Sequence, residues 1–290
     1  MNWLQIVLDT EANKVDEISD ALTDIGAVSV TWLDAKDQPM YEPSLNTTPL
    51  WKHTRIMALF EAEIDIVQLQ TLNLPPYQIQ TLEDKEWVRV WMDDFHPMQF
   101  GKNVWICPSW QTPPNLQAIN IILDPGLAFG TGTHTTTALC LEWLDSQNDL
   151  TDKTVIDYGC GSGILAITAA KLGAKHIWAV DNDPQALEAT ENNSKKNKVE
   201  KLITSVFPAK LPEHIKADCI LANILATPLI NLAPIMAKHA DSYIVLSGIL
   251  PEQTKDIITA YEPYFEIKEE IERDGWMCIV GKILVISSNS

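Results

Sequence analysis

The amino-acid sequence predicts an α/β protein in two parts: a doubly wound, mostly parallel sheet, and a smaller ferredoxin-like α+β domain before it. The large sheet is indicated by seven short strand-like segments after residue 150, most of which alternate with helical segments. Such alternation is typical of parallel strands with helices on both faces. Asp274-Gly275 is a two-residue hairpin signal, which predicts that the last strand runs antiparallel to the rest. The smaller domain is indicated by the order β-α-β-β-α-β over residues 1–83.

The first part, residues 1–83, contains four strand-like and two helix-like segments. Apolar residues three or four apart predict a helix over Val15–Ile25, and Gly26 fits its end. The strands are expected at Trp3–Leu8, Ala27–Leu33, Ile56–Phe60 and Tyr77–Leu82, a loop at Pro39–Pro49, and the second helix at Ile64–Leu72. A ferredoxin-like fold has no inherent chemistry, so it indicates no function by itself.

A connecting segment, residues 84–100, joins the two parts. Trp87, Val88 and Trp91 are spaced so that they share one face of a helix. We therefore predict a short linker helix that ends before His96-Pro97. The two tryptophans are expected to pack against a neighbouring domain rather than to grip a partner, because buried aromatic side chains usually serve cores.

The third part, residues 101–290, carries the large sheet. Its strands are expected at Thr154–Tyr158, His176–Val180, Leu202–Val206, Ala217–Ala222, Tyr243–Leu246, Phe265–Arg273 and Trp276–Val285. The first strand is followed directly by a helical segment, Ile164–Leu172. Ligands of parallel sheets bind at the carboxyl ends of the strands, so this edge is where the chemistry is expected.

The net charge of −18, from 39 acidic and 21 basic residues, disfavours binding to phosphate backbones. We therefore expect no direct contact with nucleic acid. The same charge would attract a basic partner, although solubility alone is an equally good explanation.

The sequence also points to a monomeric cytoplasmic protein. No apolar run reaches the ~18 residues that cross a membrane, and acids at Asp9 and Glu11 come too early for a signal peptide. The five cysteines are widely spaced and lack C-x-x-C pairs. They are expected to be reduced thiols and not metal ligands, so no metal site is predicted.

The sharpest motif is Asp157-Tyr158-Gly159-Cys160-Gly161-Ser162-Gly163, between a strand and a helix. Glycines there let a ligand approach the backbone at a helix N-terminus. Asp181, at the end of the next strand, can accept hydrogen bonds from both hydroxyls of a ribose. The motif therefore predicts a site for a nucleoside-containing cofactor.

Two cofactor classes fit this motif. Gly161–Ala166 matches the dinucleotide pattern G-x-G-x-x-A, which would make the protein an NAD-dependent dehydrogenase. Asp157 instead favours S-adenosylmethionine, because a carboxylate suits its cationic amino-acid end and opposes a pyrophosphate. A second polar signature at the end of the fourth strand, Ala222–Leu225, points the same way. We prefer S-adenosylmethionine over NAD, and over glycines that merely form a turn.

A second glycine-rich segment, Asp124–Thr137, lies upstream. It is not a Walker A loop, because no lysine follows its glycines. We expect a mobile segment over the cofactor, with a plain glycine-rich turn as the alternative, and Thr135–Thr137 capping or lining a helix over Ala138–Leu144. His134 could be a base, a hydrogen-bonding residue of the loop or an inert turn residue.

The chain resembles the PrmA family of ribosomal-protein methyltransferases over nearly all of its length. The resemblance is carried by Leu82–Met98, Trp105–Trp110, Leu123–Thr137, the glycine motif at 157–163, Asp181–Pro184 and Ala222–Leu225. It departs at Thr135, where many relatives have proline. It implies a class I methyltransferase fold, with S-adenosylmethionine as the cofactor and protein eleven of the large ribosomal subunit as the substrate.

The resemblance also assigns roles to single residues. It implies that Thr137, Gly159, Asp181 and Asn223 contact S-adenosylmethionine, with Gly161 in the same loop. We expect Asn223 to position the substrate amine as well, and carry His134 as a second candidate catalytic residue. Family targets are lysine ε-amines and an N-terminal α-amine. The N-terminal domain would recognise the substrate protein, and the linker helix would swing different amines into one site.

Two rival functions remain open. One is a methyltransferase that acts on RNA or a small molecule, which the acidic charge and the extra N-terminal domain disfavour. The other is a non-catalytic ribosome-assembly factor, which the intact glycine motif disfavours.

Overall fold

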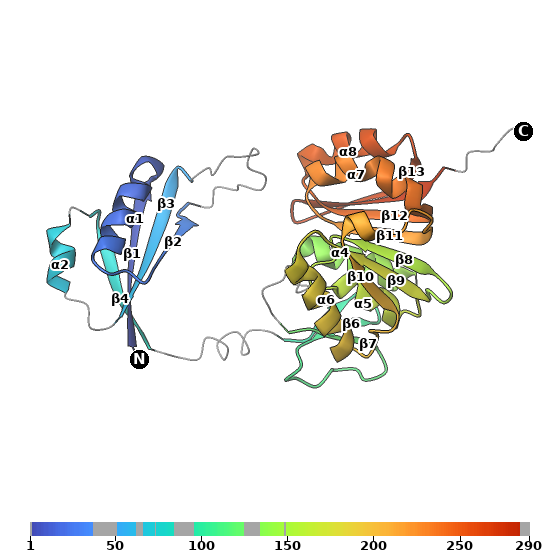
Figure 1. Cartoon of the computed structure of the whole chain (residues 1–290), viewed down its shortest axis with the longest axis horizontal. Coiled ribbons are helices and arrows are strands. Elements are labelled where there is room, and N and C mark those ends of the chain that lie inside the picture. Colours follow the sequence, from blue (N-terminus) through green and yellow to red (C-terminus); the bar gives the residue numbers. More distant parts are fainter. Residues whose placement is uncertain are drawn as a thin grey trace, which may run out of the picture. The chain divides into compact units, whose positions relative to one another are not determined.

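The structure, a computed structural model, describes residues 2–36, 51–61, 66–72, 74–83, 96–124, 134–147 and 149–284. The chain divides into two compact units, residues 1–94 and 95–290 (Figure 1). Each unit is described by itself. The predicted linker helix and the loop at Pro39–Pro49 lie outside the described residues.

The first unit has the predicted ferredoxin-like fold. Its elements are β1 (Asn2–Glu11), a 3₁₀ turn η1 (Ala12–Lys14), α1 (Val15–Asp24), β2 (Ser29–Asp34), β3 (His53–Glu61), α2 (Ile66–Thr71) and β4 (Tyr77–Glu83). The strands are ordered β2-β3-β1-β4, and every neighbouring pair is antiparallel. Alternate residues of β3 are buried, and Ile56 and Phe60 form a core with Val15 and Leu22 of α1. One sheet face therefore packs against helix α1.

The second unit begins with a small sheet that was not predicted. Its strands are β5 (Met98–Phe100), β6 (Val104–Cys107) and β7 (Ile119–Ile122). β5 pairs antiparallel with β6, which pairs parallel with β7. The predicted connecting segment, residues 84–100, therefore ended too late: β5 lies inside it, and residues 95–100 belong to the second unit.

The large sheet of this unit confirms the predicted topology. Its strands are β8 (Thr154–Tyr158), β9 (His176–Val180), β10 (Ile203–Val206), β11 (Ala217–Asn223), β12 (Ala240–Ile249), β13 (Phe265–Arg273) and β14 (Trp276–Ile283). They are ordered β10-β9-β8-β11-β12-β14-β13. β14, the last strand, pairs antiparallel with both β12 and β13, whereas the other neighbouring pairs of this sheet are parallel. Asp274 and Gly275 both have positive φ, 49° and 75°, which is the backbone of the predicted hairpin turn.

Helices cover both faces of this sheet. They are α4 (Thr135–Ser146), α5 (Ile164–Lys171), α6 (Pro184–Lys196), α7 (Ala226–His239) and α8 (Thr254–Tyr261), with 3₁₀ turns at Pro208–Lys210 and Pro251–Gln253. Consecutive residues of β8 enter different hydrophobic clusters: Val155 packs with α4 and α5, and Ile156 with α7 and α8. The sheet is therefore doubly wound, as predicted. Helix α4 begins three residues before the predicted Ala138.

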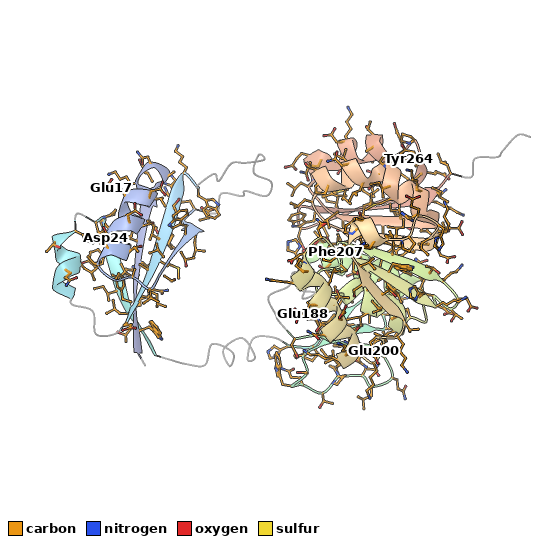
Figure 2. All side chains as sticks on the ribbon, viewed as in Figure 1. Glu17, Asp24, Glu188, Glu200, Phe207 and Tyr264 are labelled. Carbon is orange, nitrogen blue, oxygen red and sulfur yellow. The ribbon has the colours of Figure 1, made fainter. Side chains whose placement is uncertain are left out.

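The expectations drawn from composition concern the acidic surface, the cysteines and membrane-spanning segments. The side chains of Glu17, Asp24, Glu188 and Glu200 are exposed and extend outward from their helices and turns (Figure 2). All five cysteines are buried and free of disulfides. Within the described ranges, no helix is both long and apolar enough to cross a membrane.

Candidate active site

The loop after β8 is shaped by its glycines. Gly159, Gly161 and Gly163 have φ values of 83°, 53° and 80°, in the region that favours glycine. The Gly159 N–H donates to the carbonyl of Val180 at the end of β9, over 2.7 Å. A Cβ at Gly159 would overlap the side chain of Ile224, the residue after Asn223. The loop after β8 therefore meets the loop after β11, and glycine is required at that contact.

Asp181 lies beside this loop with its carboxylate held from two sides. Its Oδ2 accepts from the Gly161 N–H and its Oδ1 from the Asp183 N–H, each over 3.0 Å. Asp183 in turn caps α6 by accepting from the Gln185 N–H. A carboxylate has about four lone-pair sites, so each oxygen can still accept one hydroxyl hydrogen. The geometry fits a vicinal diol such as that of ribose.

Asp157 is buried below the loop. Its Oδ2 accepts from the Ala166 N–H over 3.0 Å, and its Oδ1 has no hydrogen-bond partner in the described part of the chain. Burial raises the pKa of Asp157 to about 7; the Ala166 bond lowers it, and the negative charge of Asp181 raises it. A buried, partnerless carboxylate oxygen is costly. A positively charged ligand beside the loop would relieve that cost, which fits S-adenosylmethionine and opposes the pyrophosphate of NAD.

Thr137 and Asn223, which are 86 residues apart in sequence, are brought into contact. The Asn223 side-chain amide donates to Thr137 Oγ1 over 3.1 Å. Thr137 is buried in the first turn of α4, and Asn223 is half-buried at the end of β11. Two of the predicted site residues thus form one polar pair at the carboxyl edge of the sheet.

His134 begins α4 as its N-cap residue, a position predicted for the threonines. Its Nδ1 accepts from the Thr136 N–H over 3.3 Å, and its ring lies 4.9 Å from the Trp276 ring in an edge-on arrangement. Burial lowers the pKa of His134 below its usual value. Residues 125–133 of the glycine-rich segment lie outside the described residues, so a mobile segment over the cofactor stays a prediction.

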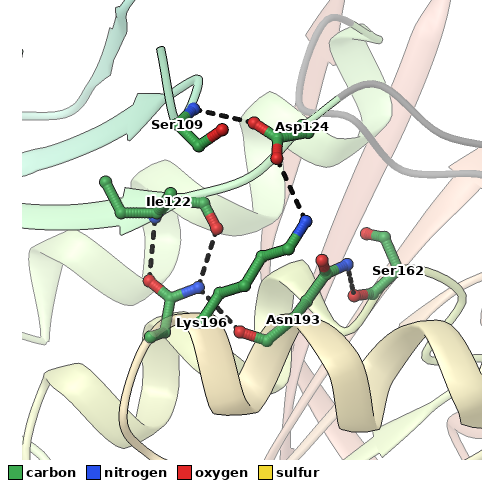
Figure 3. Close-up of polar contacts among 7 residues, drawn as sticks. Ser109, Ile122, Asp124, Ser162, Asn193 and Lys196 are labelled. Atoms are coloured by element: carbon green, nitrogen blue, oxygen red, sulfur yellow. Dashed lines mark hydrogen bonds and ion pairs between the residues drawn. The ribbon is translucent and has the colours of Figure 1, made fainter. Parts of the chain in front are cut away.

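Polar residues in and just after helix α6, which the sequence reasoning did not single out, bind the loop after β8 and the segment at the end of β7 (Figure 3). Asn193 Nδ2 donates to the Ser162 carbonyl over 2.9 Å, and Lys196 Nζ donates to Asp124 Oδ2 over 3.0 Å. Asn197 accepts from the Ile122 N–H and donates to the Ile122 carbonyl, each over 2.8 Å. Their spacing of three and four residues was the available signal, because it places all three on one side of a helix.

The described residues include no group of three or more His, Cys, Asp or Glu side chains arranged to hold a metal ion. What the site offers is two carboxylates, a tight glycine loop and a neutral amide–hydroxyl pair. These groups can bind a nucleoside with a cationic substituent and accept hydrogen bonds from an incoming donor.

Comparisons with known proteins give a consistent result. Residues 2–283 match the sequence profile of the family described as "Ribosomal protein L11 methyltransferase (PrmA)". Relatives named ribosomal protein L11 methyltransferase, from Shewanella sp. (strain ANA-3) and Shewanella woodyi, are each 48% identical over 97% of this chain and 99% of their own lengths. Among solved structures, a ribosomal protein L11 methylase from Lactobacillus delbrueckii subsp. bulgaricus is similar at 33% identity and a TM-score of 0.59, covering 65% of this chain and 99% of its own.

Proposed function

Because the chain belongs to the ribosomal protein L11 methyltransferase (PrmA) family, we propose that it transfers methyl groups from S-adenosylmethionine to amino groups of ribosomal protein L11. The second unit has the class I methyltransferase fold. The observation that carries the residue assignments is the contact between Gly159 and Ile224. It places Asn223 beside the loop that would hold the methyl donor.

The cofactor would be held by residues of four elements. Asp181 would accept hydrogen bonds from the ribose hydroxyls, and Gly159 and Gly161 would let the donor lie against the backbone. Asp157 would supply negative charge below the loop when it is ionised. Thr137, which accepts a hydrogen bond from Asn223, would line the cofactor site together with that residue. S-adenosylmethionine, when bound, supplies a methyl group on a cationic sulfur.

Asn223 would aim the substrate amine. Its amide nitrogen donates to Thr137, which directs its Oδ1 to accept from an amine N–H. A lysine amine has a pKa of about 10.4 and must lose its proton before it can attack a methyl group. Partial desolvation at the site lowers that pKa. Small polar groups also leave room for an amine to rotate and be methylated again, which suits the lysine ε-amines and N-terminal α-amine that we propose as targets.

The first unit would recognise the substrate protein. A ferredoxin-like domain carries no chemistry of its own, and a ribosomal protein is basic, whereas this chain has a net charge of −18. That charge also opposes direct nucleic-acid binding. We propose a monomer that acts in the cytoplasm without contacting a membrane.

Replacing Asn223 with alanine tests this function. We expect Asn223→Ala to lower kcat about 10²-fold, because a misplaced nucleophile loses that much, while cofactor affinity changes by only about three-fold. The assay is transfer of labelled methyl groups to purified L11, followed by mass spectrometry, with calorimetry for the cofactor. Asn192→Ala, at an exposed position on α6, is the control. The proposal would be overturned if Asn223→Ala kept the turnover of the wild-type protein. It would also be overturned if the wild-type protein methylated ribosomal RNA and not L11.

A further inference from the structure

We propose that His134 and Trp276 form a clasp that positions Thr137 and Asn223 for methyl transfer, and that His134 is a positioning residue and not the base. The clasp consists of the first turn of α4 and the tip of the β13–β14 hairpin. This inference rests on the proposed function, since its effect is read through methylation of L11.

His134 organises the first turn of α4 through both its backbone and its side chain. Its carbonyl accepts from the N–H groups of Thr137 and Ala138, over 3.0 and 3.1 Å. Its Nδ1 accepts from the Thr136 N–H and lies 2.8 Å from Thr136 Oγ1. Because Thr137 belongs to this turn, any shift of His134 moves the hydroxyl that holds the Asn223 amide.

The same contacts argue against a role as base. An imidazole nitrogen that accepts from a backbone N–H carries no proton, so the ring proton of His134 lies on Nε2. The lone pair of Nδ1 is already directed at the helix end. Taking a proton from the substrate at Nδ1 would break the cap, and Nε2 has no lone pair to offer in this tautomer.

Three contacts join the hairpin tip to α4. The His134 and Trp276 rings lie 4.9 Å apart, Thr135 Oγ1 donates to Asp274 Oδ2 over 3.2 Å, and the Arg273 guanidinium binds both oxygens of Glu142 over 2.8 and 2.7 Å.

The hairpin is connected to Asn223 through the sheet as well. Asn223 pairs with Ser247 of β12, and Ser247 pairs with Cys278 of β14, two residues after Trp276. The two ends of the Thr137–Asn223 hydrogen bond are thus fixed by one hairpin, Thr137 through the clasp and Asn223 through the sheet. A rigid frame of this kind is what a positioning mechanism requires.

Substitutions at His134 and Trp276 distinguish a helix-capping role of His134 from a role as catalytic base. Asparagine is among the best N-cap residues and alanine is a poor one. We expect His134→Ala to lower kcat about ten-fold or more and His134→Asn to restore it to within about three-fold of wild type, with the acid limb of the pH–rate profile retained. Trp276→Ala should resemble His134→Ala, and Trp276→Phe should retain most activity because an aromatic ring remains. Cofactor affinity should stay within about three-fold throughout, which shows that each variant is folded.

The outcomes are distinct. If wild-type protein methylates L11 but His134→Asn is as inactive as His134→Ala and loses its acid limb, His134 is a base and the inference fails. If Trp276→Ala has wild-type kcat, the clasp is not needed and the inference also fails. If wild-type protein does not methylate L11 at all, the proposed function itself fails. His214→Ala, at an exposed histidine, is the control.

Discussion

Asp157 is the residue through which we expect pH to act most directly on cofactor binding. Its pKa is raised to about 7 by burial, so the carboxyl group is neutral below that pH and negative above it. A cationic ligand binds the negative form better, so affinity for S-adenosylmethionine should rise between pH 6 and 8 and fall as the pH drops through 7.

Calorimetry at a series of pH values, on wild type and Asp157→Asn, tests this prediction. The amino group of the cofactor titrates in the same range, but it does so identically with both proteins. The difference between the two curves therefore isolates Asp157. Parallel curves would mean that Asp157 does not face the positive charge.

Gly159 is predicted to be irreplaceable for a local reason. Alanine there would have a strained φ of 83° and would also overlap Ile224. We expect Gly159→Ala to weaken cofactor binding at least about ten-fold, since the loop must shift. Gly26→Ala is the matched control: its φ is 100°, but no atom lies within 4 Å of the added Cβ. It should cost only about 1 kcal/mol of stability and leave cofactor affinity unchanged. Equal losses of cofactor affinity in the two variants would contradict this explanation.

The sequence predicted those site residues that belong to a recognisable motif, and not the contacts that depend on several elements. The positions of Gly159, Gly161 and Asp181 followed from a strand–glycine–helix pattern, and the structure brings them together. The partnerless oxygen of Asp157 did not follow, because it depends on atoms from several elements. Three roles remained possible for His134, because an N-cap residue can be recognised only when the first residue of the helix is known. The threonines after His134 have modest helix propensity, so the sequence did not show where the helix begins.

Helices and strands were predicted accurately where the local sequence pattern alone defines the segment. β8, β9 and β13 begin and end at the predicted residues, since apolar or alternating runs there are bounded by turn residues. The strands β5, β6 and β7 were missed. Each has three or four residues, too few for a periodic signal, and β6 pairs with β7 across a loop of eleven residues. Pairing and burial, not local pattern, create such strands.

Asn197, just after helix α6, is expected to matter more for stability than its charged neighbour. It is 5% exposed and makes hydrogen bonds to both backbone groups of Ile122 and to the Asn193 carbonyl. Asn197→Ala would leave the N–H and carbonyl of Ile122 without these partners, so we expect a loss of about 2–4 kcal/mol in the free energy of unfolding. Lys196→Ala removes only a partly exposed ion pair to Asp124 and should cost about 0–1 kcal/mol. Urea denaturation of both variants measures the difference, and equal losses would refute it.

At the scale of the whole molecule, each unit has its own hydrophobic core. The core of the first unit is built from buried residues between Leu4 and Leu69, and the two cores of the second from residues after Met98. Because the cores are separate, the fold class of each unit could be predicted independently. The hydrophobic pattern of each part of the sequence reflects only the packing of its own core. The boundary was harder to predict, since three residues of the expected linker pair with β6.

Separate cores also predict that cofactor binding and substrate recognition can be divided experimentally. A chain of residues 95–290 should fold, because the buried residues of its two cores, in the part of the chain that the structure describes, all belong to this unit. It should bind S-adenosylmethionine within about three-fold of the full chain, but its kcat/KM for L11 should fall at least about 10²-fold. The reason is that binding energy from parts of the substrate remote from the amine would be lost. Calorimetry and methylation of L11 measure the two effects, and a cooperative thermal transition confirms folding. A shortened chain that folds and methylates L11 as fast as the full protein would show that the first unit does not recognise the substrate.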